Sequence, residues 1–255
     1  MAITGAELMT WISSLMWPFM RISAMFIAAP LLSARSIPVR VRVLLAFLVA
    51  WVILPVLPPM PAVDLISVDA LVIGAYQVLI GTAMGFIFQM VFAAFVIAGQ
   101  SIANSMGLGF ASIIDPQNGL QVPVVSQAFL IMVTLIFLSL NGHLMLIDML
   151  AKSFDSLPVG FFLPSTESLW QLVNWGSTMF ASGILVAMPA VAALLLCNLA
   201  FGVASRAAPQ LNIFAVGFPV LLMVGLVFIL LTLPVVIHHL SQMMISATDL
   251  VGLVI

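Results

Sequence analysis

Four long stretches of the chain contain no aspartate, glutamate, lysine or arginine. They lie between Asp69 and Asp115, Asp115 and Asp148, Glu167 and Arg206, and Arg206 and Asp249. Each is longer than the roughly 20 apolar residues that a helix needs to cross a bilayer. The apolar runs are continuous rather than alternating, which excludes a membrane β-barrel. The pattern therefore predicts an all-α integral membrane protein.

The composition agrees with this class. Of the 255 residues, 64% are hydrophobic and 5% are charged, whereas a soluble domain carries about 25% charged residues. Membrane lipid is therefore an expected partner. Nucleic acid is not, because the chain has no basic patch that would bind phosphates. Cys197 is the only cysteine, so the chain cannot form an internal disulfide.

Six principal helices are expected, separated by loops rich in proline or charged residues. Their expected ranges are residues 8–32, 43–57, 70–98, 124–147, 169–200 and 212–238. Residues 240–255 are expected to form one more short helix. Neither an internal repeat nor a soluble domain is recognisable.

The segment 99–123 is the only long glycine-rich, polar-leaning stretch of the chain. A membrane protein keeps irregular backbone only where protein or a water-filled cavity satisfies its polar groups. Glycines provide a flexible backbone, and Asp115-Pro116 is typical of a turn. Bulky apolar residues lie between them, namely Leu108, Phe110, Ile113 and Ile114. The segment therefore fits a re-entrant or pore loop that plugs a channel, and the alternative is an ordinary surface loop.

Two further features fall inside the expected helices. Gly74, Gly81 and Gly85 recur at helical spacing, and small residues allow close helix packing in a membrane. Arg21 lies midway along the first helix, where a charge is costly and is usually paired or faces water. Snorkelling from a shifted helix is the alternative for Arg21.

The chain shows no catalytic or cofactor signature. A nucleophile with its base, a nucleotide-binding loop and a zinc spacing are all lacking. His238 and His239 are adjacent, so on a helix their side chains diverge by about 100°. We expect no enzymatic activity, no cofactor and no metal.

Specific residues resemble a known family. They are Gly99-Gln100-Ser101-Ile102-Ala103, Met106-Gly107-Leu108-Gly109-Phe110-Ala111, Asp115-Pro116, the early loop SARSIPVRVR and Asn141-Gly142-His143. Together with the length, they resemble the FliR family of flagellar export proteins, which is related to the SctT components of virulence type III secretion systems. The resemblance covers essentially the whole chain.

The resemblance implies a single export-gate domain over residues 1–255. Residues 8–168 would form a FliP-like portion with a plug loop at 106–121, and residues 169–255 a FliQ-like hairpin and tail. The implied plug and gate residues are Met106, Gly107, Leu108, Gly109, Phe110, Ala111, Ile113, Ile114, Asp115, Pro116 and Gly119.

The implied function is that of a non-enzymatic subunit of the flagellar export gate. It would line and seal the conduit for unfolded flagellar proteins, in the bacterial inner membrane at the flagellar basal body. FliP, FliQ and FlhB would be its partner subunits. A virulence secretion gate, a self-sufficient small-molecule transporter and a membrane-embedded enzyme are the alternatives, and the last lacks convergent polar residues within the helices.

Overall fold

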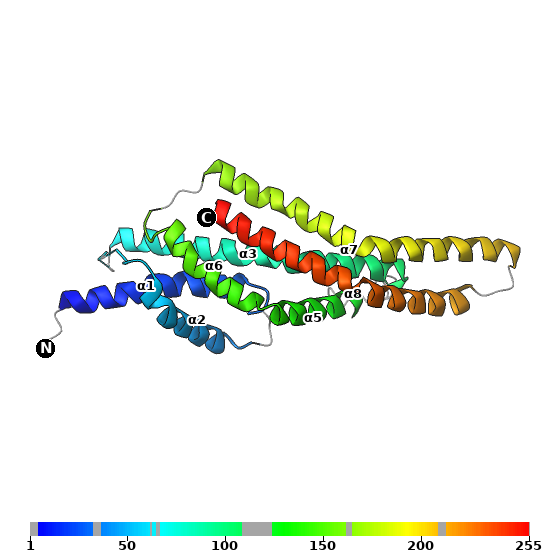
Figure 1. Ribbon diagram of the computed structural model, residues 1–255, viewed down its shortest axis with the longest axis horizontal. Coiled ribbons are helices and arrows are strands. Elements are labelled where there is room, and N and C mark those ends of the chain that lie inside the picture. Colours follow the sequence, from blue (N-terminus) through cyan, green and yellow to red (C-terminus); the bar gives the residue numbers. More distant parts are fainter. Residues whose placement is uncertain are drawn as a thin grey trace. The chain divides into compact units, whose positions relative to one another are not determined.

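The computed structural model describes residues 5–32, 37–61, 63–64, 67–108, 124–161, 165–208 and 213–254. Its regular structure consists of helices, with no strand in these ranges (Figure 1). The elements are α1 (Gly5–Ala28), α2 (Val39–Ile53), the 3₁₀ turn η1 (Leu54–Val56), α3 (Val68–Ser105), α5 (Val124–Ser139), α6 (Gly142–Ser156), α7 (Thr166–Ala207) and α8 (Ile213–Val254). The expected all-α class is confirmed.

Five stretches of the described residues are long and apolar enough to cross a membrane. They belong to α1, α2 with η1, α3, α7 and α8. The bent pair α5 and α6 brings the number to six if it is taken as one broken span. The expectation of about six long hydrophobic helices is thus confirmed.

Several helix boundaries differ from the sequence prediction. The helix α3 ends at Ser105 rather than at residue 98, so residues 99–105, expected as the start of an irregular segment, are helical. The single helix expected over 124–147 is broken, because Asn141 adopts a left-handed backbone conformation with φ of 57°. Asparagine tolerates this conformation better than most residues, and its carbonyl then accepts the first hydrogen bonds of α6, from the amides of Leu144 and Met145. Conversely, the separate tail helix expected at 240–255 does not exist, since α8 runs without a break through His238 and His239.

The chain divides into two compact units. Unit 1 comprises Met1–Met90, Asn141–Trp175 and Met244–Ile255, and unit 2 comprises Val91–Leu140 and Gly176–Met243. The helices α3, α7 and α8 each contribute one part to both units.

In unit 1, α1 and α2 bury very different surfaces. On α1, Trp17, Arg21 and Met25 form a buried stripe at four-residue spacing, as expected for a helix that packs with one face. The buried residues of α2 are smaller on average, namely Ala46, Ala50 and Ile53. The remaining faces of α2 expose large apolar side chains, so α2 contributes little to the core of the unit.

Unit 2 has a core rich in phenylalanine. Phe92 of α3 and Phe137 of α5 are buried with their ring centroids 5.4 Å apart, in an edge-to-face arrangement, which is a favoured geometry for aromatic pairs. Gly99 allows α3 and α5 to approach closely, because a Cβ atom at this position would lie 2.7 Å from the Cα atom of Ser126.

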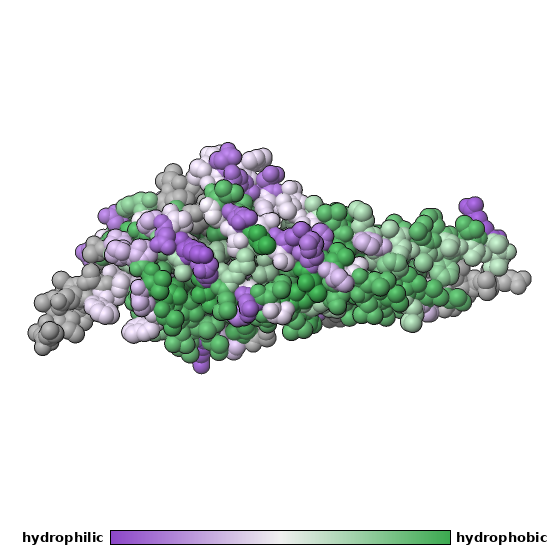
Figure 2. All heavy atoms as spheres, in the orientation of Figure 1, coloured by the Kyte–Doolittle hydropathy of each residue, from purple (hydrophilic) through white to green (hydrophobic). Residues whose placement is uncertain are grey.

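The surfaces of α7 and α8 are strongly apolar. Figure 2 shows continuous hydrophobic colouring over the parts of these helices near their connection. Exposed large residues include Leu195, Leu196, Leu199, Val203, Met223, Leu230 and Leu231. Extended exposed apolar surfaces of this kind are typical of contacts with lipid or with other proteins.

Candidate functional site

The start of the glycine-rich segment is the part of it that the structure describes. The helix α3 ends at Ser105, where the amide of Met106 donates to the carbonyl of Ile102 at 2.9 Å. Gly107 follows with φ of 84°, a conformation that favours glycine because other residues clash there. Gly107 therefore turns the chain away from the axis of α3.

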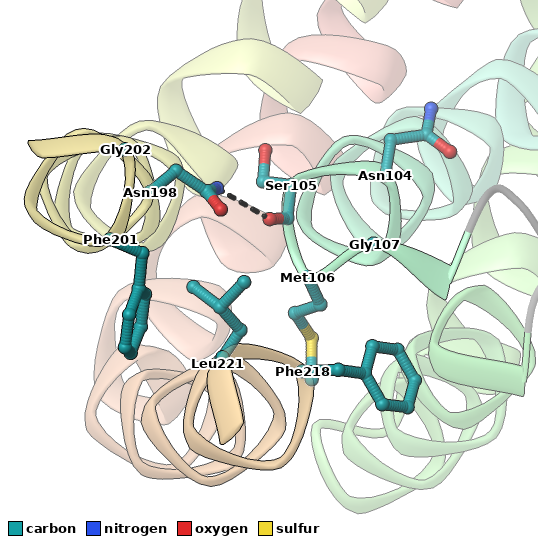
Figure 3. A pocket seen from close by; sticks show the side chains of 10 residues that line it. Asn104, Ser105, Met106, Gly107, Asn198, Phe201, Gly202, Phe218 and Leu221 are labelled. Carbon is teal, nitrogen blue, oxygen red and sulfur yellow. Dashed lines mark hydrogen bonds between the residues drawn. The ribbon is translucent and has the colours of Figure 1, made fainter. Parts of the chain in front are cut away.

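An apolar pocket of about 470 Å³ surrounds this turn within unit 2. We call it the Met106 pocket (Figure 3). Its lining comes from the end of α3, from α7 and from α8, and comprises Asn104, Ser105, Met106, Gly107, Asn198, Phe201, Gly202, Gly217, Phe218 and Leu221.

Met106 fixes the turn to α8. Its side chain is 1% exposed and points toward α8 (Figure 3). There it fills the space over Gly225, where an added Cβ atom would lie 2.5 Å from Cε and 2.6 Å from Cγ of Met106. The flexible methionine side chain suits this irregular gap, and glycine at 225 makes the close approach possible.

A polar contact fixes the same turn to α7. The Nδ2 atom of Asn198 donates to the carbonyl oxygen of Ser105 at 3.2 Å (Figure 3). The last carbonyls of a helix have no partner within that helix, so Asn198 satisfies one of them. The turn is therefore held from both sides by the α7–α8 pair.

The structure places three of the predicted plug residues, Met106, Gly107 and Leu108, at this turn. The other predicted plug and gate residues lie outside the described residues; they are Gly109, Phe110, Ala111, Ile113, Ile114, Asp115, Pro116 and Gly119. Their part in a seal stays a prediction.

Arg21 occupies a different environment, inside unit 1. It is fully buried, and its Nε atom donates to Oε1 of Gln77 at 2.8 Å. Nη1 donates to the carbonyl and hydroxyl oxygens of Ser153 at 2.8 and 3.0 Å, and Nη2 to the carbonyl of Leu157 at 2.9 Å. The guanidinium carbon lies 3.9 Å from the ring centroid of Phe154. We call these five residues the Arg21 cluster.

The electrostatics of the Arg21 cluster do not depend on a carboxylate, since no ion pair to Arg21 exists among the described residues. Ser153 belongs to the last turn of α6 and Leu157 directly follows that helix. The C-terminus of a helix carries partial negative charge and unpaired carbonyls. The planar, five-donor guanidinium matches several such acceptors at once. Arg21 thus caps α6 and joins it to α1 and α3.

The three predicted packing glycines all lie on α3 against α1. A Cβ atom at Gly81 would collide with the carbonyl oxygen of Arg21, and one at Gly85 would lie 2.6 Å from Cβ of Ala28. At Gly74 the obstacle is only the flexible end of Met20, at 2.9 Å. Gly81 and Gly85 therefore meet firm neighbours, whereas Gly74 does not.

Sequence reasoning missed the partners of both regions. Gln77 and Asn198 carried a usable signal, because each is an amide side chain within a long apolar helix. Gly225 carried none, since nothing in the sequence relates it to Met106. Within the described ranges, no three histidine, cysteine or acidic residues gather in a way that could hold a metal ion.

Comparison with known proteins identifies the family. Residues 12–247 match the family model described as "Bacterial export proteins, family 1". The chain is 38% identical over 234 residues to the flagellar biosynthetic protein FliR of Escherichia coli K12, covering 92% of this chain and 89% of that protein. It is 36% identical to FliR of Pectobacterium carotovorum (96% and 94% covered) and 32% identical to FliR of Bacillus subtilis 168 (86% and 85%). The chain therefore belongs to the FliR family of bacterial export proteins.

Proposed function

We propose that this chain is the FliR-type subunit of the flagellar protein export gate and that its glycine-rich segment seals the conduit. The role in flagellar export comes from its relatives, which are named as flagellar biosynthetic proteins. The same names favour the flagellar over the virulence branch. The subunit works without catalysis, in the bacterial inner membrane at the flagellar basal body.

One observation carries the sealing role: the turn at Met106 and Gly107 is fixed on both sides. Met106 packs on Gly225, and Asn198 holds the carbonyl of Ser105. The segment that follows therefore starts from a defined point. A plug needs such an anchor, because a freely moving chain would not return to the same place after each substrate.

The apolar side chains beyond the anchor supply the barrier. Phe110, Ile113 and Ile114 are the residues we assign to the seal. A narrow constriction lined by such groups excludes water and blocks small ions without a rigid gate. An unfolded polypeptide displaces them as it enters, and the glycines of the segment allow the movement.

The exposed apolar surfaces of α7 and α8 support an assembled state. We assign them to contacts with FliP, FliQ and FlhB subunits as well as lipid. The hairpin of residues 169–255 is the FliQ-like portion in this proposal, and residues 8–168 are the FliP-like portion.

A self-sufficient small-molecule transporter is the weaker alternative. Transporters of that class place charged groups at a midplane binding site. Arg21 is the buried charge of the described residues, and its Nε, Nη1 and Nη2 atoms are all engaged by the protein itself. It therefore offers little to a substrate.

The double variant Phe110→Ala with Ile113→Ala tests the seal. We expect a higher ion leak through the assembled gate in cells, measured as a loss of membrane potential with secretion halted. The matched control is Ile131→Ala with Leu135→Ala, which shortens two exposed apolar side chains of α5. Normal assembly with an unchanged leak in the double variant would contradict the sealing role.

A further inference from the structure

The helix α2 carries an apolar groove with a cation at one end. The groove has a volume of about 520 Å³ and lies within unit 1. Its lining residues are Phe19, Val39, Arg40, Val43, Leu44 and Phe47. It is shallow and open, so a ligand would lie along the outside of the helix.

The groove follows a single stripe of α2. Arg40, Val43, Leu44 and Phe47 have the spacing i, i+3, i+4 and i+7, which places them on one face of a helix. Phe19 of α1 forms the opposite wall, and its ring centroid lies 6.3 Å from that of Phe47. The groove is therefore charged at the Arg40 end and apolar along the rest of its length.

Arg40 gives the charged end of the groove a preference for anions. It is exposed, and no ion pair to it exists among the described residues. The first turn of α2 contains no acidic residue. Three of the six basic residues of the chain, Arg35, Arg40 and Arg42, fall within this short part of the sequence. Their charge is complementary to an anion.

The length of the stripe matches one layer of a bilayer. The next residue of the same face is Trp51, whose ring centroid lies 6.2 Å from that of Phe47. From Arg40 to Trp51 the helix rises about 16 Å, which is about half of the roughly 30 Å hydrocarbon core. An acyl chain whose headgroup lies at Arg40 would therefore run along the whole stripe.

We propose that this groove binds an anionic phospholipid, with its phosphate on Arg40 and one acyl chain along Val43, Leu44 and Phe47. The neighbouring faces of α2 are also apolar and exposed, as at Val41, Leu48 and Val52, so the groove opens onto a surface suited to further lipid. The site is independent of the sealing role and stands if that role fails.

Lipid binding to the full-length chain, purified with its co-purifying subunits, tests the site. Native mass spectrometry compares phosphatidylglycerol with phosphatidylcholine of the same acyl chains. One arginine near an anionic lipid surface is worth about 1 kcal/mol, which corresponds to about a fivefold preference. We expect this preference in the wild type and its loss in Arg40→Gln.

Arg206→Gln is the matched control, because Arg206 is an exposed arginine at the end of α7, outside the groove. It is expected to keep the preference. A wild type that binds both lipids equally would overturn the proposal. If Arg206→Gln lost the preference for phosphatidylglycerol to the same extent, the proposal would also be overturned, because the preference would then be a general effect of charge.

Photocrosslinking in intact cells identifies the occupant. A benzophenone-bearing amino acid replaces Leu44, which lines the groove and is 59% exposed. After irradiation, we expect the chain to gain the mass of a phospholipid. A crosslink to another polypeptide at this position would overturn the proposal and assign the groove to a protein partner.

Discussion

The Arg21 cluster and the Met106 pocket hold the chain by opposite means. In the cluster, four directional hydrogen bonds converge on one buried guanidinium. In the pocket, a methionine fills the space over a glycine, and one side-chain hydrogen bond supplements it. Directional bonds fix one geometry and are costly to leave unmade, whereas a methionine adapts its shape. The first arrangement suits a rigid joint and the second suits a contact that can adjust.

Removing the guanidinium of Arg21 is expected to have the largest effect on stability, and so it tests the difference between the two regions most strongly. Arg21→Met leaves the acceptors on Gln77, Ser153 and Leu157 without their donor. We expect a loss of about 3–5 kcal/mol in unfolding free energy, because several buried acceptors lose their donor and each costs about 1–3 kcal/mol when left unsatisfied. Thermal unfolding of the solubilised protein measures it.

The control for this variant is Lys152→Met. Lys152 pairs with Asp148 at 2.7 Å, but both side chains are exposed, and such pairs contribute at most about 1 kcal/mol. Equal losses of unfolding free energy in Arg21→Met and Lys152→Met would show that the Arg21 cluster does not hold α1, α3 and α6 together.

A methyl group at Gly81 would perturb the Arg21 cluster through the backbone of Arg21. Its Cβ atom would meet the backbone of Arg21, which cannot move aside independently. We expect Gly81→Ala to cost about 3 kcal/mol, at the upper end of the range for overpacking. Gly74→Ala meets only the end of Met20, so its effect should be near zero once the higher helix propensity of alanine is included. The amount of each variant found in the membrane measures both effects.

A methyl group at Gly225 tests whether the anchor is adaptable. Gly225→Ala displaces the Met106 side chain from its place, and the flexible side chain can take another rotamer. We expect a loss of only about 1 kcal/mol in unfolding free energy, together with an increased ion leak. A large loss of stability without a leak would show that the pocket is as rigid as the cluster.

Of the two variants in the Met106 anchor, the smaller effect is expected at Asn198. This residue is exposed, and it donates one hydrogen bond to Ser105, so Asn198→Leu should cost about 0.5 kcal/mol, the low end for a single hydrogen bond. Loss of this bond leaves Met106 in place. The leak should therefore be smaller than in Gly225→Ala, and the reverse order would assign the anchor to α7 rather than α8.

The helical class followed from the sequence because it depends on local composition. The charge-free stretches that predicted the spans contain most of α3, α7 and α8, and one of them contains α5 with the start of α6. The spacing of Gly81 and Gly85 also marked them as candidate packing positions, but it did not indicate which helix they would face.

The contacts that specify the two regions were not predictable, because they join distant residues. Gln77 lies 56 positions from Arg21, and Ser153 lies 132 positions from it. Asn141 was read as part of a helix, although Asn-Gly is a common turn signal and asparagine tolerates a left-handed backbone. The end of α8 was predicted too early, at residue 238, although the helix continues past His238 and His239 to Val254.

The capping of α6 by Arg21 joins two segments that are synthesised at different times. The ribosome adds about 5–20 residues per second, so the 132 positions between Arg21 and Ser153 take about 7 to 26 seconds. During that interval Arg21 lacks its acceptors at the end of α6, although Gln77 is made after the first 56 positions, and an uncompensated charge is costly in hydrocarbon. The first helix can therefore complete its hydrogen bonds only after α6 has been made.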